Sequence, residues 1–308
     1  MTTMGKYSRD RRFACLLIGL SLVQTGCGNS THQANSSQGN SSDVQVQHVF
    51  IVVEENHSYS SVIGNSDMPY LNRLATTYAY AQGYYADTHP SIGNYFMLTT
   101  GQIVTNDDGS STEVNADNIV RHLVAAGKTW KEYSEDLPTV GYTGGDTGGY
   151  VQHHNPLSYF SDVRESSAEA QNLVPFAQLA ADLANHKLPS YGFIVPNDDD
   201  NAHDGTLAQA DSWLQAKIDP LVTSSEFNSA GGGLLIIVFD ESFDSDTVNG
   251  GGHVAWVVVG PNVKKGFTWA ASYQHESTLR FMSEAIGLTD FPGAAATAPD
   301  MEEFISGD

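Results

Sequence analysis

The sequence predicts a single α/β domain, in which helices cover both faces of a mainly parallel sheet. Short and almost unbroken apolar runs recur from residue 46 onward, as in strands that are buried on both faces. Segments with apolar residues at helical spacing separate these runs, and such alternation is typical of a parallel sheet. We find no internal repeat and no linker within residues 46–308, so we expect this stretch to be one domain.

The apolar runs define four expected strands. These are residues 46–53, 191–195, 234–239 and 254–259. Four periodic segments define the expected helices, and in the first of them Ile119, Val120 and Leu123 repeat at helical spacing. The expected helices are residues 117–126, 176–184, 207–218 and 276–286. Three stretches rich in Gly and Asp, residues 106–111, 141–149 and 244–252, are expected to be loops.

The first 45 residues resemble an export signal that is followed by a flexible linker. Basic residues up to Arg12 precede the apolar run 13–23, which is too short for a stable membrane span, and Cys27 follows. Residues 1–27 resemble a bacterial lipoprotein signal peptide with Cys27 as the lipid-bearing residue, while the alternative is ordinary secretion. Residues 28–45 are rich in Ser, Asn, Gln and Gly and predict a flexible linker. We therefore expect an exported protein of the periplasm or cell envelope, attached to the membrane only through a lipid at Cys27.

The charge and the cysteine content exclude several classes of function. The formal net charge is −22, which repels phosphate backbones and argues against nucleic-acid binding. Cys15 and Cys27 are the only cysteines, so the body contains neither a disulfide framework nor a catalytic thiolate. An anionic substrate therefore needs a local positive feature, and a metal ion is the simplest one.

Carboxylates follow the expected strands at the edge where sites form in open α/β sheets. Glu55 and Asn56 follow the first strand, and Asp240 and Glu241 follow the strand at 234–239. Clustered acids raise one another's pKa unless a cation lies among them. This pattern favours a divalent metal, whose identity among Zn, Mn, Mg and Ca stays open. The alternative is that each acidic cluster is a solvated turn.

A candidate nucleophile precedes a helix-like segment. Ser91 lies after Pro90 and before Gly93, and the residues from Asn94 onward can form a helix. A serine at a helix N-terminus faces backbone N–H groups that bind phosphate. The alternative is that Ser91 only caps the helix.

Four segments resemble the bacterial phosphoesterase family of the alkaline phosphatase superfamily, and they occur in the family's order. They are EENHSY, HPSIGNYFMLTTG, FDES and YQHESTLRFMSEAIGL. The family includes acid phosphatases and phosphatidylinositol-phosphate phosphatases, with phospholipase C enzymes as relatives. The resemblance covers essentially all of residues 46–308 and implies an alkaline-phosphatase-like fold.

The resemblance also implies roles for individual residues. It assigns Ser91 as the nucleophile and Asn94 as the group that holds a phosphoryl oxygen. The implied metal ligands are Glu55, Asn56, Ser91, Asp240 and Glu241. The wider superfamily holds a second metal through residues that match Asp199, His203 and His275. In family members with one metal, His203 and His275 would instead contact phosphate or protonate the leaving group.

Two more histidines are candidates for binding substrate. His154 resembles the histidine of a family HNP segment, and His253 opens an expected strand; a structural role is the alternative for each. The resulting hypothesis is a metal-dependent phosphatase that hydrolyses small phosphomonoesters through a phosphoserine intermediate. A phospholipase C-type phosphodiesterase and a catalytically silent surface lipoprotein are the alternatives. Because few cations adjoin the motifs, we expect a preference for compact substrates with a single phosphate.

Overall fold

The computed structural model describes residues 45–306 of the chain. The expected signal peptide and all of the expected linker except residue 45 lie outside these residues. No helix within the described part of the chain has the length and hydropathy needed to cross a membrane.

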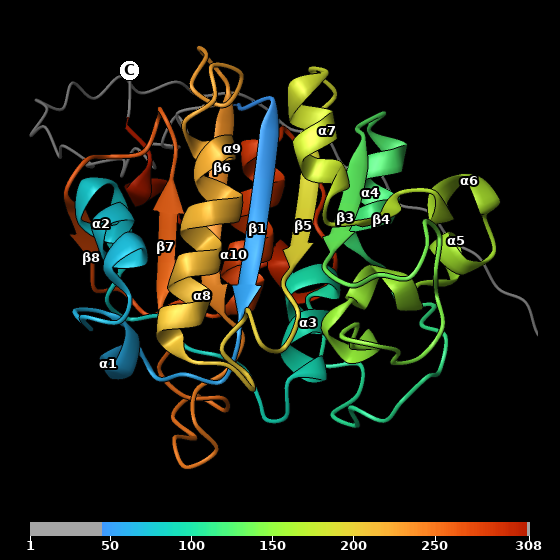
Figure 1. The fold of residues 1–308 in the computed structure, drawn as a ribbon, viewed down its shortest axis with the longest axis horizontal. Helices are drawn as coiled ribbons and strands as arrows, with labels where there is room; N and C mark the ends of the chain where they lie inside the picture. Colours follow the sequence, from blue (N-terminus) through green and yellow to red (C-terminus); the bar gives the residue numbers. More distant parts are fainter. Residues whose placement is uncertain (1–44, 307–308) are drawn as a thin grey trace, which may run out of the picture. The chain divides into compact units, whose positions relative to one another are not determined.

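Eight strands form one mixed sheet, in the order β4-β3-β5-β1-β6-β7-β2-β8 (Figure 1). The strands are β1 (His48–Glu54), β2 (Ala79–Ala81), β3 (Trp130–Ser134), β4 (Leu173–Pro175), β5 (Tyr191–Val195), β6 (Gly233–Phe239), β7 (Trp256–Val259) and β8 (Phe267–Trp269). Strand β1 lies at the centre, where Val49 pairs in parallel with both Tyr191 of β5 and Leu234 of β6. Only β7 runs antiparallel to its neighbours, β6 and β2. The predicted α/β class is therefore confirmed.

Helices cover both faces of the sheet. The α-helices are α1 (Tyr59–Val62), α2 (Pro69–Thr77), α3 (Ile92–Thr100), α4 (Ile119–Ala125), α5 (Ser161–Arg164), α6 (Ser167–Ala170), α7 (Gln178–Ala184), α8 (Leu207–Trp213), α9 (Asp219–Val222) and α10 (His275–Ala285). Helices α3 and α10 pack together on one face, and α2, α7 and α8 lie on the other (Figure 1). A π-helical segment, η3 (Leu214–Ile218), joins α8 to α9. Four short 3₁₀ helices complete the described elements: η1 (Gln152–His154), η2 (Pro156–Tyr159), η4 (Gly293–Ala296) and η5 (Glu302–Phe304).

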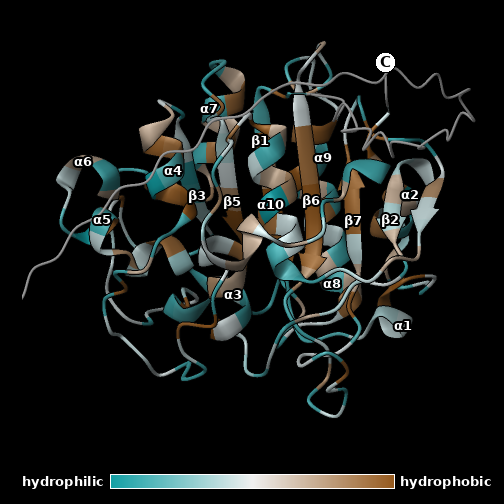
Figure 2. Ribbon diagram, turned by 180° about the vertical axis from the view of Figure 1, so that it is seen from behind, coloured by the Kyte–Doolittle hydropathy of each residue, from teal (hydrophilic) through white to brown (hydrophobic). Residues whose placement is uncertain are grey.

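The strands predicted from unbroken apolar runs are the buried central ones. Every residue of β1, β5, β6 and β7 is buried, and these strands form the brown core of the sheet in Figure 2. Strands β2, β3, β4 and β8 lie toward the edges of the sheet. They are three to five residues long, and β3 contains Lys131 and Glu132, so no apolar run marks them.

The parallel strands β1, β5 and β6 end at the same edge of the sheet, and two loops are joined there. The backbone of Ala86 exchanges hydrogen bonds with Gly251 and Gly252, at 3.0 and 2.9 Å. Gly250 has a φ of +111°, and a Cβ atom at this position would lie 1.9 Å from the carbonyl oxygen of Asp87. Only glycine permits this close approach, which ties the loop after β6 to the loop that precedes α3.

Candidate active site

Ser91 lies at the N-terminus of α3 but makes no capping hydrogen bond with its side chain. Its hydroxyl instead donates to Glu55 Oε2 at 3.2 Å and lies 3.5 Å from Glu241 Oε1. All nine residues of α3 are buried, so this helix fixes the serine against the sheet edge. The Ser91 side chain therefore does not cap the helix but points at two carboxylates.

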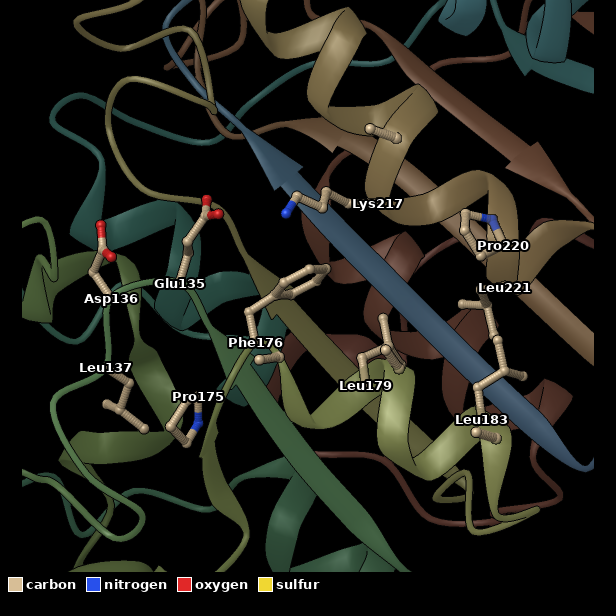
Figure 3. Close-up of a pocket in the computed structure, with 14 residues that line it drawn as sticks. Glu135, Asp136, Leu137, Pro175, Phe176, Leu179, Leu183, Lys217, Pro220 and Leu221 are labelled. Atoms are coloured by element: carbon tan, nitrogen blue, oxygen red, sulfur yellow. The ribbon is translucent and has the colours of Figure 1, made fainter.

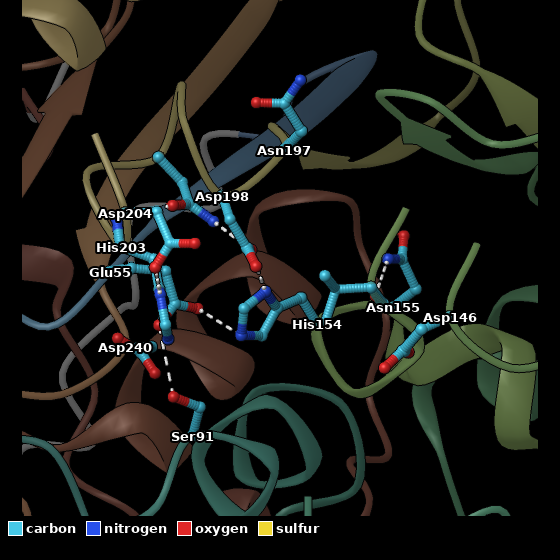
Figure 4. A network of polar contacts seen from close by, with 12 residues as sticks. Glu55, Ser91, Asp146, His154, Asn155, Asn197, Asp198, His203, Asp204 and Asp240 are labelled. Carbon is cyan, nitrogen blue, oxygen red and sulfur yellow. Dashed lines mark hydrogen bonds and ion pairs between the residues drawn. The ribbon is translucent and has the colours of Figure 1, made fainter. Parts of the chain in front are cut away.

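Three buried carboxyl groups, of Glu55, Asp240 and Glu241, lie beside this hydroxyl, and Figure 4 labels the first two. Burial, followed by the charge of Asp240, raises the pKa of Glu55 well above its ordinary value. Burial and the charge of Asp240 also raise the pKa of Glu241, to about 9. Burial raises the pKa of Asp240 as well, and its buried Oδ2 atom has no hydrogen-bond partner among the described residues. Three crowded acids with an unpartnered oxygen are a donor set that fits a divalent cation.

Two asparagines shape the loops around these acids. Asn56 has a positive φ of 56°, which asparagine tolerates, and its N–H donates to Asp240 Oδ1 at 3.1 Å. Asn94 Oδ1 accepts from the N–H groups of Asp87 and Thr88, at 3.0 and 3.2 Å. Its Nδ2 atom lies 3.3 Å from Glu241 Oε2. Asn94 therefore holds the turn that leads to Ser91 while it presents its amide group to the acid cluster.

His154 is buried between two carboxylates. Its Nε2 atom lies 3.3 Å from Glu55 Oε1, and its Nδ1 atom lies 3.2 Å from Asp198 Oδ1 (Figure 4). Tyr95 stacks on the ring at 5.2 Å between centroids and donates its hydroxyl to Glu55 Oε1 at 2.5 Å. This histidine, expected to line a substrate pocket, thus lies directly beside Glu55.

The acidic loop after β5 turns Asp198 rather than Asp199 toward this site. Asp199 is exposed. Burial favours a higher pKa for Asp198, but His154 and His203 outweigh it and hold the pKa below its ordinary value. His203 is part of the same group, with its Nδ1 atom 2.8 Å from Asp204 Oδ1 and its ring 5.8 Å from that of His154. Ligand atoms of Asp198, His203 and Asp204 lie within 4.8 Å of one another.

The two remaining candidate histidines have other partners. His275 is fully buried, and its Nε2 atom lies 2.6 Å from the backbone oxygen of Asp240 while Nδ1 lies 3.0 Å from the Tyr84 hydroxyl. Burial lowers its pKa to about 4. His253 stacks between Tyr59 and Tyr85 and hydrogen-bonds to the backbone of residue 82. The contacts of His275 thus include neither Asp199 nor His203, so the expected grouping of these three residues is not seen. The contacts of His253 described here do not include Ser91.

Sequence reasoning overlooked two residues that contact the acids. Tyr95 lies four residues after Ser91, one turn along α3, which puts both on the same side of the helix. That spacing could have identified it. His89 lies 3.1 Å from Glu241 through Nδ1, and its position two residues before Ser91 was the available signal.

A cavity of about 730 Å³ lies away from these residues, between α7 and the segment formed by η3 and α9 (Figure 3). Its walls are mostly apolar, and Glu135, Asp136 and Lys217 lie at one end. The candidate residues are absent from its lining in the described structure. Glu135 accepts from Asn197 N–H at 3.3 Å, so this end supports the loop that carries Asp198.

The chain matches the model of the Phosphoesterase family over residues 64–289, which include Ser91 and both acids that follow β6. It is 32% identical over 258 residues to a phosphatidylinositol-3-phosphatase of Mycobacterium tuberculosis, covering 83% of this chain and 82% of that protein. It is 31% identical over 242 residues to a probable acid phosphatase of Kluyveromyces lactis, covering 75% of this chain and 56% of that protein. The chain thus spans little more than half the length of that yeast relative.

Solved structures show the same fold at low identity. A protein of the alkaline phosphatase superfamily from Vibrio parahaemolyticus has a TM-score of 0.56 and 12% identity, covering 79% of this chain and 67% of that one. A lipoteichoic acid synthase from Listeria monocytogenes has a TM-score of 0.57 and 10% identity, covering 86% and 77%. Together with the family match, these similarities show that the chain belongs to the Phosphoesterase family, has the fold of the alkaline phosphatase superfamily and is a hydrolase of phosphoric esters.

Proposed function

We propose that this protein is an exported, metal-dependent phosphatase that hydrolyses phosphomonoesters through a phosphoserine intermediate at Ser91. The observation that carries the proposal is the Ser91 hydroxyl, which lies at a helix N-terminus yet points at the carboxylates of Glu55 and Glu241. The acid phosphatases among its relatives support the same activity. The basic and apolar sequence before Cys27 supports export.

The residues that would hold the metal are Glu55, Asn56, Ser91, Asp240 and Glu241. The raised pKa values of the three acids and the unpartnered Asp240 Oδ2 atom support this assignment, because a cation relieves both conditions. When bound, a divalent ion lowers the pKa of a coordinated hydroxyl and neutralises phosphate charge.

In the first step, the Ser91 hydroxyl releases its proton to water, and its oxygen attacks phosphorus while the bond to the leaving alkoxide breaks. We expect the Asn94 amide group, which lies 3.3 Å from Glu241 Oε2, to hold a phosphoryl oxygen, where transition-state charge gathers. His203 supplies a proton to the alkoxide, which leaves as an alcohol. We assign this role to His203 rather than His275, because His203 is partly exposed, whereas both ring nitrogens of His275 have protein partners.

In the second step, water attacks the phosphoserine. The attacking water gives one proton to His203, which replaces the proton that His203 gave to the alkoxide. The Ser91–phosphorus bond breaks, inorganic phosphate leaves, and the serine oxygen takes up a proton from water. We assign His154 to the wall of the substrate pocket, the role that the resemblance implies, because it adjoins Glu55, Asp198 and Tyr95. The reaction therefore consumes one water for each ester and regenerates the hydroxyl.

The experiment that tests the proposal combines turnover with trapping of the intermediate. We expect Ser91→Ala to lose activity on p-nitrophenyl phosphate by far more than the ~10²–10³-fold that follows loss of one oxyanion donor. Acid quenching of the wild-type enzyme during turnover should yield a peptide phosphorylated at Ser91. Removal of divalent ions by a chelator should abolish turnover, and their return should restore it. A Ser91→Ala enzyme with near-normal activity, or a chelated enzyme with full activity, would refute the proposal.

The proposal also includes a substrate preference. Clustered phosphates beside so many acids need several cationic contacts, which the candidate site lacks among its described residues. We expect kcat/KM to be higher for monoesters with one phosphate than for bisphosphates or phosphodiesters. A higher kcat/KM for a phosphatidylcholine would instead favour the phospholipase C-type alternative.

A further inference from the structure

His89 is held in one orientation just before the nucleophile loop. Its Nε2 atom lies 2.9 Å from the backbone oxygen of Asp246. A carbonyl oxygen only accepts hydrogen bonds, so Nε2 must carry the ring proton. In the neutral imidazole, Nδ1 is then a bare lone pair.

The Nδ1 atom of His89 is buried, and no hydrogen-bond partner lies in suitable geometry among the described residues. It lies 3.1 Å from Glu241 Oε2, so a lone pair faces a carboxylate oxygen. The Glu241 side chain is only 4% exposed. Two acceptors in such contact repel each other unless a positive charge lies between them.

Asp244 adds a third donor at the same place. One of its carboxylate oxygens and the ligand atoms of His89 and Glu241 all lie within 4.8 Å of one another. The neighbouring Asp246 differs, because its carboxylate accepts from the N–H groups of His253 and Val248 within the loop. Asp246 therefore holds the loop in shape, and the exposed Asp244 is left for a ligand.

We propose that His89, Glu241 and Asp244 form a second divalent-cation site, which shares Glu241 with the metal site beside Ser91. One imidazole nitrogen and two carboxylates suit Mn²⁺ or Zn²⁺, and the exposure of Asp244 leaves room for water ligands. The inference rests on the proposed function only through Glu241, which lies between His89 and Ser91. An ion held here neutralises the face of Glu241 that is turned away from the nucleophile.

A proton is the competing explanation. A proton on His89 Nδ1 or on Glu241 Oε2 would turn this contact into a hydrogen bond without any ion, and Asp244 would then be an ordinary surface acid. The two explanations differ in the number of ions that the protein binds, which can be measured without any activity assay.

The test is the stoichiometry of Mn²⁺ binding to the purified full chain, measured by equilibrium dialysis and metal analysis at neutral pH. We expect two ions for each wild-type chain. Asp244→Asn should bind one, or hold the second at least tenfold more weakly. His89→Gln should also bind one ion, or hold the second at least tenfold more weakly, because it lacks the Nδ1 ligand atom. Its amide nitrogen can still reach the backbone oxygen of Asp246. Asp67→Asn, which removes a charge from an exposed acid in the turn before α2, should still bind two. Circular dichroism establishes that each variant is folded.

Several outcomes would overturn the site. One ion in both the wild type and Asp244→Asn would leave only the His89–Glu241 ion pair, and two ions in both Asp244→Asn and His89→Gln would put the second ion elsewhere. Asp240→Asn separates this inference from the proposed function, because Asp240 belongs to the first site alone. Loss of one ion in that variant with the Asp244-dependent ion retained supports both sites. If it keeps both ions and full turnover, the first site fails while the second stands.

Discussion

Tyr95 determines how Glu55 faces Ser91. Its hydroxyl donates to Glu55 Oε1, which leaves Oε2 for the serine, and its ring stacks on His154. Glu55 is a ligand in the proposed metal site, and groups that orient a metal ligand are typically worth 10–100-fold in metal affinity or activity. The side chain thus links the acid cluster to the histidine beside it.

We predict that Tyr95→Phe lowers both metal affinity and kcat/KM by roughly 10–100-fold, because it removes the hydroxyl and keeps the stacked ring. Thermal stability should change little. Metal titration and steady-state kinetics on p-nitrophenyl phosphate measure the effect. Tyr273→Phe is the matched control, since it also removes a tyrosine–glutamate hydrogen bond, to Glu303, outside the candidate site. Equal losses in both variants would show that Tyr95 has no specific role.

The residues that sequence reasoning could find are those whose position follows from the ends of strands. Glu55 and Asp240 come directly after buried strands, and the structure brings both to Ser91. The run after β5 offered three adjacent aspartates, and only the backbone turn decides that Asp198 faces His154 while Asp199 is exposed. Local spacing contains no information on that choice.

Strand β3 holds the loop that carries His154. Glu132 Oε2 accepts from Leu157 N–H at 3.0 Å, and Ser134 donates to Asn155 Oδ1. Two side chains of one strand therefore anchor η2 and the residue that joins it to η1, the 3₁₀ helix that ends at His154. Burial raises the pKa of Glu132 to about 8, although the hydrogen bond from Leu157 N–H opposes the shift. Its Oε1 atom has no hydrogen-bond partner. We therefore expect this carboxyl to be largely protonated in the folded protein at neutral pH.

Neutral Glu132 makes the stability of the protein depend on pH. The unfolded chain loses this proton near pH 4.5, whereas the folded protein keeps it up to about pH 8. The contribution of this proton to the free energy of unfolding is complete below pH 4.5. It is lost as pH rises through this window, by about 1.4 kcal/mol per pH unit for one proton.

We predict that Glu132→Gln becomes more stable relative to the wild type as pH rises from about 5 to about 8, because glutamine reproduces the protonated carboxyl but does not titrate. Urea unfolding at the two pH values measures the difference. Glu165→Gln, at an exposed position, should show no such trend. A pH-independent difference for Glu132→Gln would mean that Glu132 is ionised in the folded protein.

At the scale of the whole molecule, the net charge of −22 opposes the approach of any anionic substrate. Salt shortens the range of this repulsion, since the Debye length falls from about 30 Å at 0.01 M to about 8 Å at 0.15 M. Binding of a phosphate ester should therefore improve with ionic strength, whereas chemistry within the buried acid cluster should not.

We predict that kcat/KM for p-nitrophenyl phosphate rises several-fold when NaCl increases from about 0.01 M to about 0.15 M, while kcat stays constant. O-Phosphoethanolamine, whose ammonium group offsets part of its charge, should show a smaller rise. Kinetics with both substrates at fixed metal concentration test this. A fall in kcat/KM with salt would indicate that a local positive potential dominates over the net charge.

The overall fold was predictable because its central strands have unbroken apolar sequences. Strands β1, β5, β6 and β7 are buried throughout, and burial on both faces requires unbroken apolar sequence. The edge strands were not predictable in the same way. Strand β2 has only three residues, and β3 places Glu132 in the core, where tertiary contacts override the local pattern.

From the central position of β1, we expect catalytic competence to be a late event in folding. Val49 pairs with Tyr191 and with Leu234, so the strand that delivers Glu55 acquires its neighbours only after long stretches of chain have closed into loops. Ser91 and Asp240 likewise come from distant parts of the sequence. Refolding should thus restore helical circular dichroism before it restores turnover, and the interval between the two signals would time the closure of the central sheet.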